Sequence, residues 1–169
     1  MKFNIYQKAF ITLLCICFAQ YNFAQNVKFI AADAPGFDYS GRINNANPKM
    51  PEFYWPGTSV EIRFRGSSFV NVLMEDEKGK NYFNVILNGN SNKPIVFQCK
   101  KGKGKYQVLK GLDPKQTYRV IIFKRTETDE GYTKFAGMEL SKGAQMMLIK
   151  RKARYKIEFF GNSITYHIL

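Results

Sequence analysis

The chain has 169 residues, of which 26 are Lys or Arg and 13 are Asp or Glu, so its formal net charge is +13. It contains one His, at position 167, and three Cys, of which only Cys99 lies beyond residue 25. These counts exclude a zinc site with paired Cys or His ligands. They also exclude a disulfide within the part of the chain that follows residue 25, because that part contains a single Cys. We therefore expect neither a metal nor a cofactor.

The first 24 residues are typical of a secretory signal peptide. Basic residues accompany an apolar run at residues 9–19, which is shorter than the ~20 residues needed to span a bilayer. We expect cleavage after Ala24, which leaves Gln25 first and gives a secreted or periplasmic protein with no membrane contact. A lipoprotein signal that uses Cys15 or Cys17 and a buried N-terminal helix are the alternatives.

The basic charge persists without this segment, because 24 basic residues then stand against 13 acidic ones, a net charge of +11. Such a surface attracts nucleic acid, anionic lipid or acidic glycans. An exported protein rarely meets nucleic acid, so we expect no nucleic-acid partner. The densest basic run, residues 100–105, is interrupted by glycines and predicts a solvated hairpin loop. Binding of an acidic polymer there is the alternative.

Apolar and polar residues alternate with a period of two between residues 27 and 150, which predicts strands with one buried face. Turn signals such as Pro56-Gly57, Asn88-Gly89 and Asp113-Pro114 separate these strands. Many short strands without a helical stripe predict an all-β fold, an antiparallel two-sheet sandwich over residues 25–150. The apolar residues expected on these strands are Val60, Ile62, Phe64, Val70, Val72, Met74, Phe83, Val85, Leu87, Val108, Val120, Ile122, Phe135 and Met138.

The pattern changes after Lys150. A basic segment at residues 150–154 precedes an apolar strand at residues 155–160, which ends in Gly161-Asn162-Ser163. A strand followed by a Gly, a polar residue and a Ser is typical of the start of an α/β unit. We therefore predict that residues 151–169 are the first strand and turn of a second, truncated domain.

Several segments, in this order and spacing, resemble carbohydrate esterase family 2. They are residues 40–43, 53–60, 63–66, 81–85, 111–112, 124–127, 135–137 and 157–165. Members of that family join an N-terminal jelly-roll domain to a C-terminal SGNH (GDSL-type) hydrolase domain. The resemblance implies a jelly-roll-like sandwich, a partner that is an acetylated polysaccharide or oligosaccharide, and a nucleophilic Ser163.

Ser163 stands where the family usually has the Ser of Gly-Asp-Ser, with Asn162 in place of the Asp. A Ser hydroxyl needs an adjacent base, and at a strand-to-helix turn its own N–H can help to bind the oxyanion. In the family the base is a His near the C-terminus, so we do not assign that role to His167, which would point along the helix. The alternative is a turn Ser at a helix start. We expect the chain alone to be inactive.

Other residues have weaker claims to function. Tyr54 and Trp55 are candidates for sugar stacking, although a core anchor is the preferred interpretation of Trp55. Arg125 and Glu127 share strand parity and could pair with each other or with the missing domain; a structural ion pair is preferred to a substrate contact. The acidic residues 75–77 are interpreted as solvated turn carboxylates and not as a glycosidase pair.

Three functions therefore compete on sequence grounds. The first is the N-terminal part of a secreted carbohydrate O-acetyl esterase similar to acetyl xylan esterases. The second is a non-catalytic carbohydrate-binding module, which rests on analogy of fold. The third is an inert gene fragment.

Overall fold

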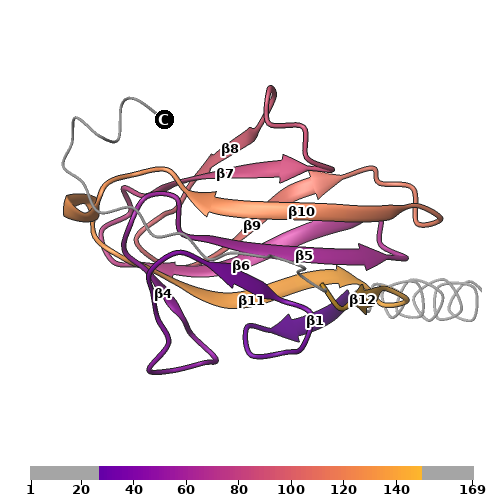
Figure 1. Cartoon of the computed structure of the whole chain (residues 1–169), viewed down its shortest axis with the longest axis horizontal. Helices are drawn as coiled ribbons and strands as arrows, with labels where there is room; N and C mark the ends of the chain where they lie inside the picture. Colours follow the sequence, from indigo (N-terminus) through magenta and orange to yellow (C-terminus); the bar gives the residue numbers. More distant parts are fainter. Residues whose placement is uncertain (1–26, 150–169) are drawn as a thin grey trace, which may run out of the picture.

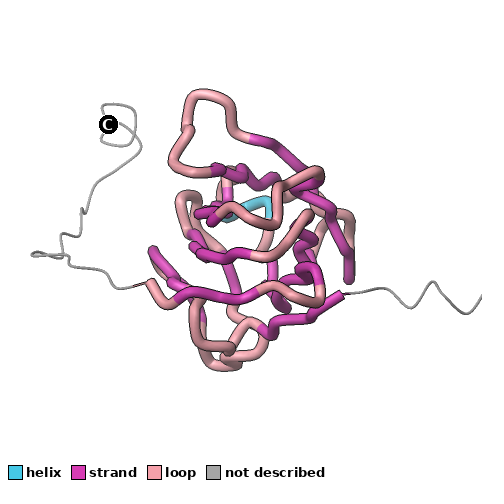
Figure 2. The backbone as a smooth tube through the Cα atoms, turned by 90° about the vertical axis from the view of Figure 1, so that its right-hand side faces the viewer, coloured by secondary structure: helices cyan, strands magenta, loops and turns pink. Residues whose placement is uncertain are grey.

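The computed structural model describes residues 27–149, which form two antiparallel sheets packed face to face (Figures 1 and 2). This confirms the predicted all-β sandwich. The strands are β1 (Val27–Ala31), β2 (Asp38–Ser40), β3 (Ile43–Asn44), β4 (Glu52–Phe53), β5 (Ser59–Arg65), β6 (Phe69–Asp76), β7 (Tyr82–Leu87), β8 (Ile95–Gln98), β9 (Gly102–Lys110), β10 (Thr117–Lys124), β11 (Thr133–Ser141) and β12 (Gln145–Met147). A 3₁₀ turn, η1, covers Thr128–Glu130. Within residues 27–149, no helix is long and apolar enough to cross a membrane.

Each sheet contains six strands. Sheet A has the order β3-β4-β11-β6-β9, with β1 also paired to β11. Sheet B has the order β12-β5-β10-β7-β8, with β2 also paired to β5. From β5 onward the chain crosses between the sheets at every connection except the β7–β8 hairpin, so strands adjacent in sequence lie mostly in opposite layers. Such crossings place residues distant in sequence side by side.

The core lies between the sheets and is filled by the inward residues of the alternating strands. Val60, Ile62 and Phe64 on β5 are fully buried, as the period of two predicts. Phe53 is also fully buried, and its ring lies 6.2 Å from that of Phe135. Burying a side chain of this size stabilises the fold by ~1.5–3 kcal/mol. The remaining expected core positions are buried too, apart from Leu87, which is partly exposed and packs against the core.

The lysine-rich run at residues 100–105 is not a loop, so that prediction was wrong. From Gly102 onward the run forms the start of β9, an end strand of sheet A, which pairs with β6 from Asp76 to Phe69. Glycines normally weaken strands, but Gly104 has a packing reason, because an added Cβ would collide with the Tyr106 ring. The Tyr106 hydroxyl in turn accepts a hydrogen bond from the Lys100 N–H at 2.7 Å.

Strand β11 contains a bulge at which the register with β6 shifts between Phe135 and Gly137. Gly137 has φ +132, and a Cβ there would collide with the carbonyl oxygen of Ile30 on β1. Only glycine fits this position, since it combines a backbone conformation unfavourable for other residues with the close approach of a neighbouring strand.

Candidate functional site

The residues singled out from the sequence fall into two groups. Ser163 and His167, the signal segment 1–24 and the predicted second domain at 151–169 lie outside the described residues. Tyr54 and Trp55 lie within them, in the loop that joins β4 to β5.

Trp55 is not a core anchor, so the preferred interpretation from the sequence was wrong. Its side chain is 49% exposed, and the guanidinium of Arg42 lies 5.6 Å from the centre of the ring. The anchor is Phe53, two residues earlier, because the strand directs Phe53 inward before the chain turns at Pro56-Gly57. The Gly57 N–H donates to the Lys124 carbonyl at 2.8 Å and ties this loop to the end of β10.

Tyr54 is partly buried and already has an aromatic partner. Its ring centre lies 5.1 Å from that of Tyr132, and its hydroxyl donates to Oε2 of Glu52 at 3.2 Å. Burial and the neighbouring Glu52 carboxylate raise the pKa of Tyr54. The amine of Lys134 lies 5.5 Å from the Tyr132 ring centre and 3.8 Å from Glu52. Of the two aromatic candidates, Trp55 therefore offers the more accessible ring.

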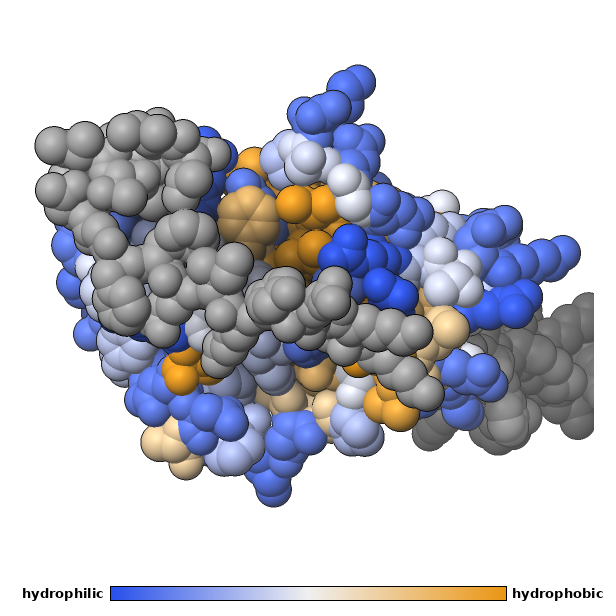
Figure 3. Space-filling view, viewed as in Figure 1, coloured by the Kyte–Doolittle hydropathy of each residue, from blue (hydrophilic) through white to orange (hydrophobic). Residues whose placement is uncertain are grey.

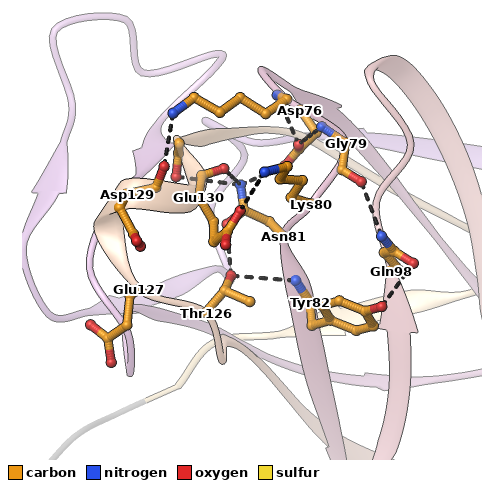
Figure 4. A network of polar contacts seen from close by, with 12 residues as sticks. Asp76, Gly79, Lys80, Asn81, Tyr82, Gln98, Thr126, Glu127, Asp129 and Glu130 are labelled. Atoms are coloured by element: carbon orange, nitrogen blue, oxygen red, sulfur yellow. Dashed lines mark hydrogen bonds and ion pairs between the residues drawn. The ribbon is translucent and has the colours of Figure 1, made fainter.

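A buried carboxylate organises the loops at this end of the sandwich (Figure 4). Asp76 is 2% exposed, so it is not the solvated turn residue expected from the sequence. Its Oδ1 accepts the N–H groups of Lys78 and Gly79, at 3.2 and 2.6 Å. Its Oδ2 accepts from the Asn81 side chain at 2.8 Å and from the Thr133 hydroxyl. We call the set Asp76, Asn81, Lys124, Thr126 and Thr133 the Asp76 cluster.

Asn81 connects the carboxylate to the loop that follows β10. Its Nδ2 also donates to the carbonyls of Glu130 and Gly131, both at 3.3 Å, and its Oδ1 accepts from the Thr126 hydroxyl at 2.6 Å. The side chain thus uses both ends of its amide, which leaves the buried group fully satisfied.

Lys124 brings a buried cation to the same cluster. Its side chain is fully buried, and its amine donates to the carbonyls of Thr126 and Glu127 at 2.8 and 2.9 Å. Burial lowers the pKa of Lys124, and the negative charge of Asp76 opposes that shift. A buried charge needs such partners, because an uncompensated one is very costly.

The expected pairing of Arg125 with Glu127 is absent. Strand β10 ends at Lys124, so these two residues do not share a strand, and both are exposed without an ion pair between them. Among residues 27–149, no group of three or more His, Cys, Asp or Glu could hold a metal ion. Since both oxygens of Asp76 are engaged, the cluster fixes loops and does not present an acid–base pair.

The sequence contains one signal for this cluster. Two of the segments that carry the resemblance, residues 81–85 and 124–127, supply Asn81, Lys124 and Thr126. In the structure these polar residues lie together in the Asp76 cluster, although neither segment suggests a site by itself.

Residues 39–149 match the Carbohydrate esterase 2 N-terminal family. The chain belongs to this family. Over 133 residues it is 31% identical to Cellulase/esterase CelE of Acetivibrio thermocellus, a match that covers 79% of the chain and 16% of that protein.

Solved structures of the family have the same fold. A family two carbohydrate esterase from Clostridium thermocellum, in complex with cellohexaose, has a TM-score of 0.66 and 29% identity over 77% of this chain and 38% of its own. An acetyl xylan esterase from the rumen bacterium Butyrivibrio proteoclasticus has a TM-score of 0.63 at 12% identity, over 76% of this chain and 35% of its own. The second likeness shows the fold alone. The chain thus spans less than half the length of each of these relatives.

Proposed function

We propose that residues 27–149 are the N-terminal domain of an exported carbohydrate esterase that removes acetyl groups from a polysaccharide, and that Ser163 is its nucleophile. The observation that carries this proposal is the family match over residues 39–149, followed in the sequence by Gly161-Asn162-Ser163. The relative that was solved with cellohexaose supports a carbohydrate as the partner.

The outer face of sheet B supports a role in packing against a hydrolase domain. Ile86, Ile121 and Phe123 alternate with buried core residues and so point outward, yet all three are apolar. Tyr82 and Val96 beside them are 38% and 44% exposed, and Figure 3 shows hydrophobic atoms gathered over β7 and β8. An apolar sheet face of this kind is typical of a surface that packs against another domain.

The position of β12 makes the hydrolase domain the expected occupant of this face. β12 pairs with β5 in sheet B, so the described part of the chain ends at an edge of this sheet. Two strands separate β12 from β7, and strands lie ~4.8 Å apart, so a few extended residues suffice to reach the apolar face.

In the proposed reaction the Ser163 Oγ attacks the acetyl carbonyl carbon and passes its proton to a base. The base then protonates the departing sugar oxygen, and water releases acetate from the acyl-serine in a second step. The resemblance assigns the base to a His of the hydrolase domain. We therefore expect the 169-residue chain alone to show no Ser163-dependent hydrolysis.

The test uses a chimera in which residues 1–169 replace the corresponding part of the Clostridium thermocellum esterase. It should hydrolyse p-nitrophenyl acetate and acetylated xylan, and Ser163→Ala should lower the rate by ~10³-fold or more. Ser91→Ala, at an exposed loop position, is the matched control and should retain full activity. A folded chimera whose activity survives Ser163→Ala would disprove the assignment.

Export is tested separately. N-terminal sequencing of protein secreted by the native host should begin at or near Gln25, because the preceding residues have signal-peptide anatomy. Recovery of the mature protein with Met1 intact would contradict this part of the proposal.

A further inference from the structure

The outer face of sheet A contains a groove with a volume of about 860 Å³. It crosses the strands β1, β6, β9 and β11 on the side of the sandwich opposite the apolar face of sheet B. Its lining includes Ser68, Phe69, Asn71, Lys105, Gln107 and Ser141. Most of the lining thus lies on strands, which hold side chains more rigidly than loops do.

A row of polar side chains runs across the strands beside the groove. Asn71 on β6 is paired with Glu139 on β11 and with Gln107 on β9. The Asn71 Nδ2 donates to Glu139 Oε2 at 3.1 Å, while Lys105 Nζ donates to both Glu139 oxygens at 3.1 and 3.0 Å. These bonds fix the Asn71 amide in place, and the Lys105 charge is compensated by that of Glu139.

Asn71 retains an unused acceptor. Its Oδ1 is shielded from solvent and has no hydrogen-bond partner among the described residues. A buried polar atom without a partner costs ~1–3 kcal/mol, so a small shift of the Asn71 side chain that brings Oδ1 to a donor in the groove is favoured. Gln107, which is exposed in the same row, offers a second carboxamide.

One aromatic ring lies beside this row, and a second lies at its end. Phe69 lines the groove two residues before Asn71 on β6, and therefore on the same face of the sheet. Phe29, the β1 partner of Glu139, is 54% exposed. A sugar ring has an apolar C–H face and a rim of hydroxyl groups, so a flat aromatic ring beside amide groups matches both of its surfaces.

We propose that this groove is a non-catalytic binding site for a chain of neutral sugars, with Phe69 beneath a sugar ring and Asn71 and Gln107 bonded to its hydroxyls. Of the two lysines that line the groove, Lys105 is already paired with Glu139, so an acidic polymer would find only the exposed Lys142. The lysines along β9 have another role, since charged side chains protect an edge strand from pairing with other chains. The site needs no contribution from Ser163 and extends the proposed function to retention of the polysaccharide.

The test measures binding of cellohexaose and xylohexaose to the Ser163→Ala chain by isothermal titration calorimetry. We expect saturable binding that changes little with salt and that weakens ~10-fold or more in Asn71→Ala and in Gln107→Ala. Gln145→Ala is the matched control, because Gln145 is an exposed Gln on β12 in sheet B, and it should bind like the parent. Urea unfolding of each variant establishes that the sandwich is intact.

Three results would overturn the proposal. One is the absence of binding to both oligosaccharides, and another is equal binding by the groove variants and the Gln145→Ala control. The third is binding only to polygalacturonate that disappears in high salt, which would assign the lysines to an acidic polymer. Because the measurement uses a chain without the Ser163 hydroxyl, its outcome is independent of the proposed hydrolysis.

Discussion

Replacing Asp76 with Asn should destabilise the sandwich far more than its position beside a turn suggests. The change preserves the shape of the side chain but turns one acceptor oxygen into an NH₂ group. Whichever way the amide is oriented, that group faces two donors. They are either the Lys78 and Gly79 N–H groups or the side chains of Asn81 and Thr133.

The magnitude follows from these contacts. A hydrogen bond to a charged group contributes ~1.5–3 kcal/mol, so the loss of two costs ~3–6 kcal/mol before relaxation. Asp76→Asn also removes the negative charge that offsets the buried Lys124 amine. We expect a net loss of ~4 kcal/mol, which lowers the urea midpoint by ~2 M for a domain of this size.

The assay is equilibrium urea unfolding followed by circular dichroism. Glu75→Gln is the matched control, because it removes a carboxylate charge one residue earlier on the outward side of β6, and it should cost ~0.5 kcal/mol or less. A drop in midpoint below ~0.5 M for Asp76→Asn, or equal effects of the two variants, would refute the inference that Asp76 organises these loops.

Further predictions concern other parts of the sandwich. Burial raises the pKa of Cys99 from 9.0 to about 12, so the folded thiol stays protonated above pH 9 while the unfolded thiol ionises. Its stabilising contribution is complete below pH 9 and should fall by ~1.4 kcal/mol per pH unit towards pH 12, a slope that Cys99→Ala should reduce in urea titrations. Gly137→Ala should cost ~3 kcal/mol or more in thermal unfolding, whereas Gly143→Ala, where a Cβ meets nothing within 4 Å, should be nearly neutral. Acrylamide should readily quench the fluorescence of Trp55, the single Trp, in the folded protein. Fluorescence that acrylamide quenches only weakly would contradict the exposure of this side chain.

The sequence predicted the part of the fold that depends on local alternation. In β5, every second residue must enter the core, so Val60, Ile62 and Phe64 could be assigned without knowledge of their neighbours. The family resemblance added the jelly-roll arrangement. Local alternation does not predict how the strands pair, because pairing joins residues far apart in sequence. Asp76 and Thr133, for example, are 57 positions apart.

The errors share this non-local origin. Trp55 is apolar enough for a core position, but the space between the sheets at that end is filled by Phe53, Phe83 and Phe135. The glycines of the lysine-rich run suggested a loop, because the Tyr106 ring that covers Gly104 is visible only after folding. The groove on sheet A escaped notice for the same reason, since its polar row comes from three strands.

The strands β8 and β9, each at one end of its sheet, differ strongly in the side chains that they expose. β9 presents exposed Lys103 and Lys105, whereas β8 presents Ile95 and Val96, which are 42% and 44% exposed. Backbone groups at a sheet edge recruit strands from other molecules unless charge opposes the approach. Preparations of this sandwich without a covering domain should therefore self-associate through β8. Ile95→Lys would place a charge on β8, as Lys103 and Lys105 do on β9, and should reduce this self-association.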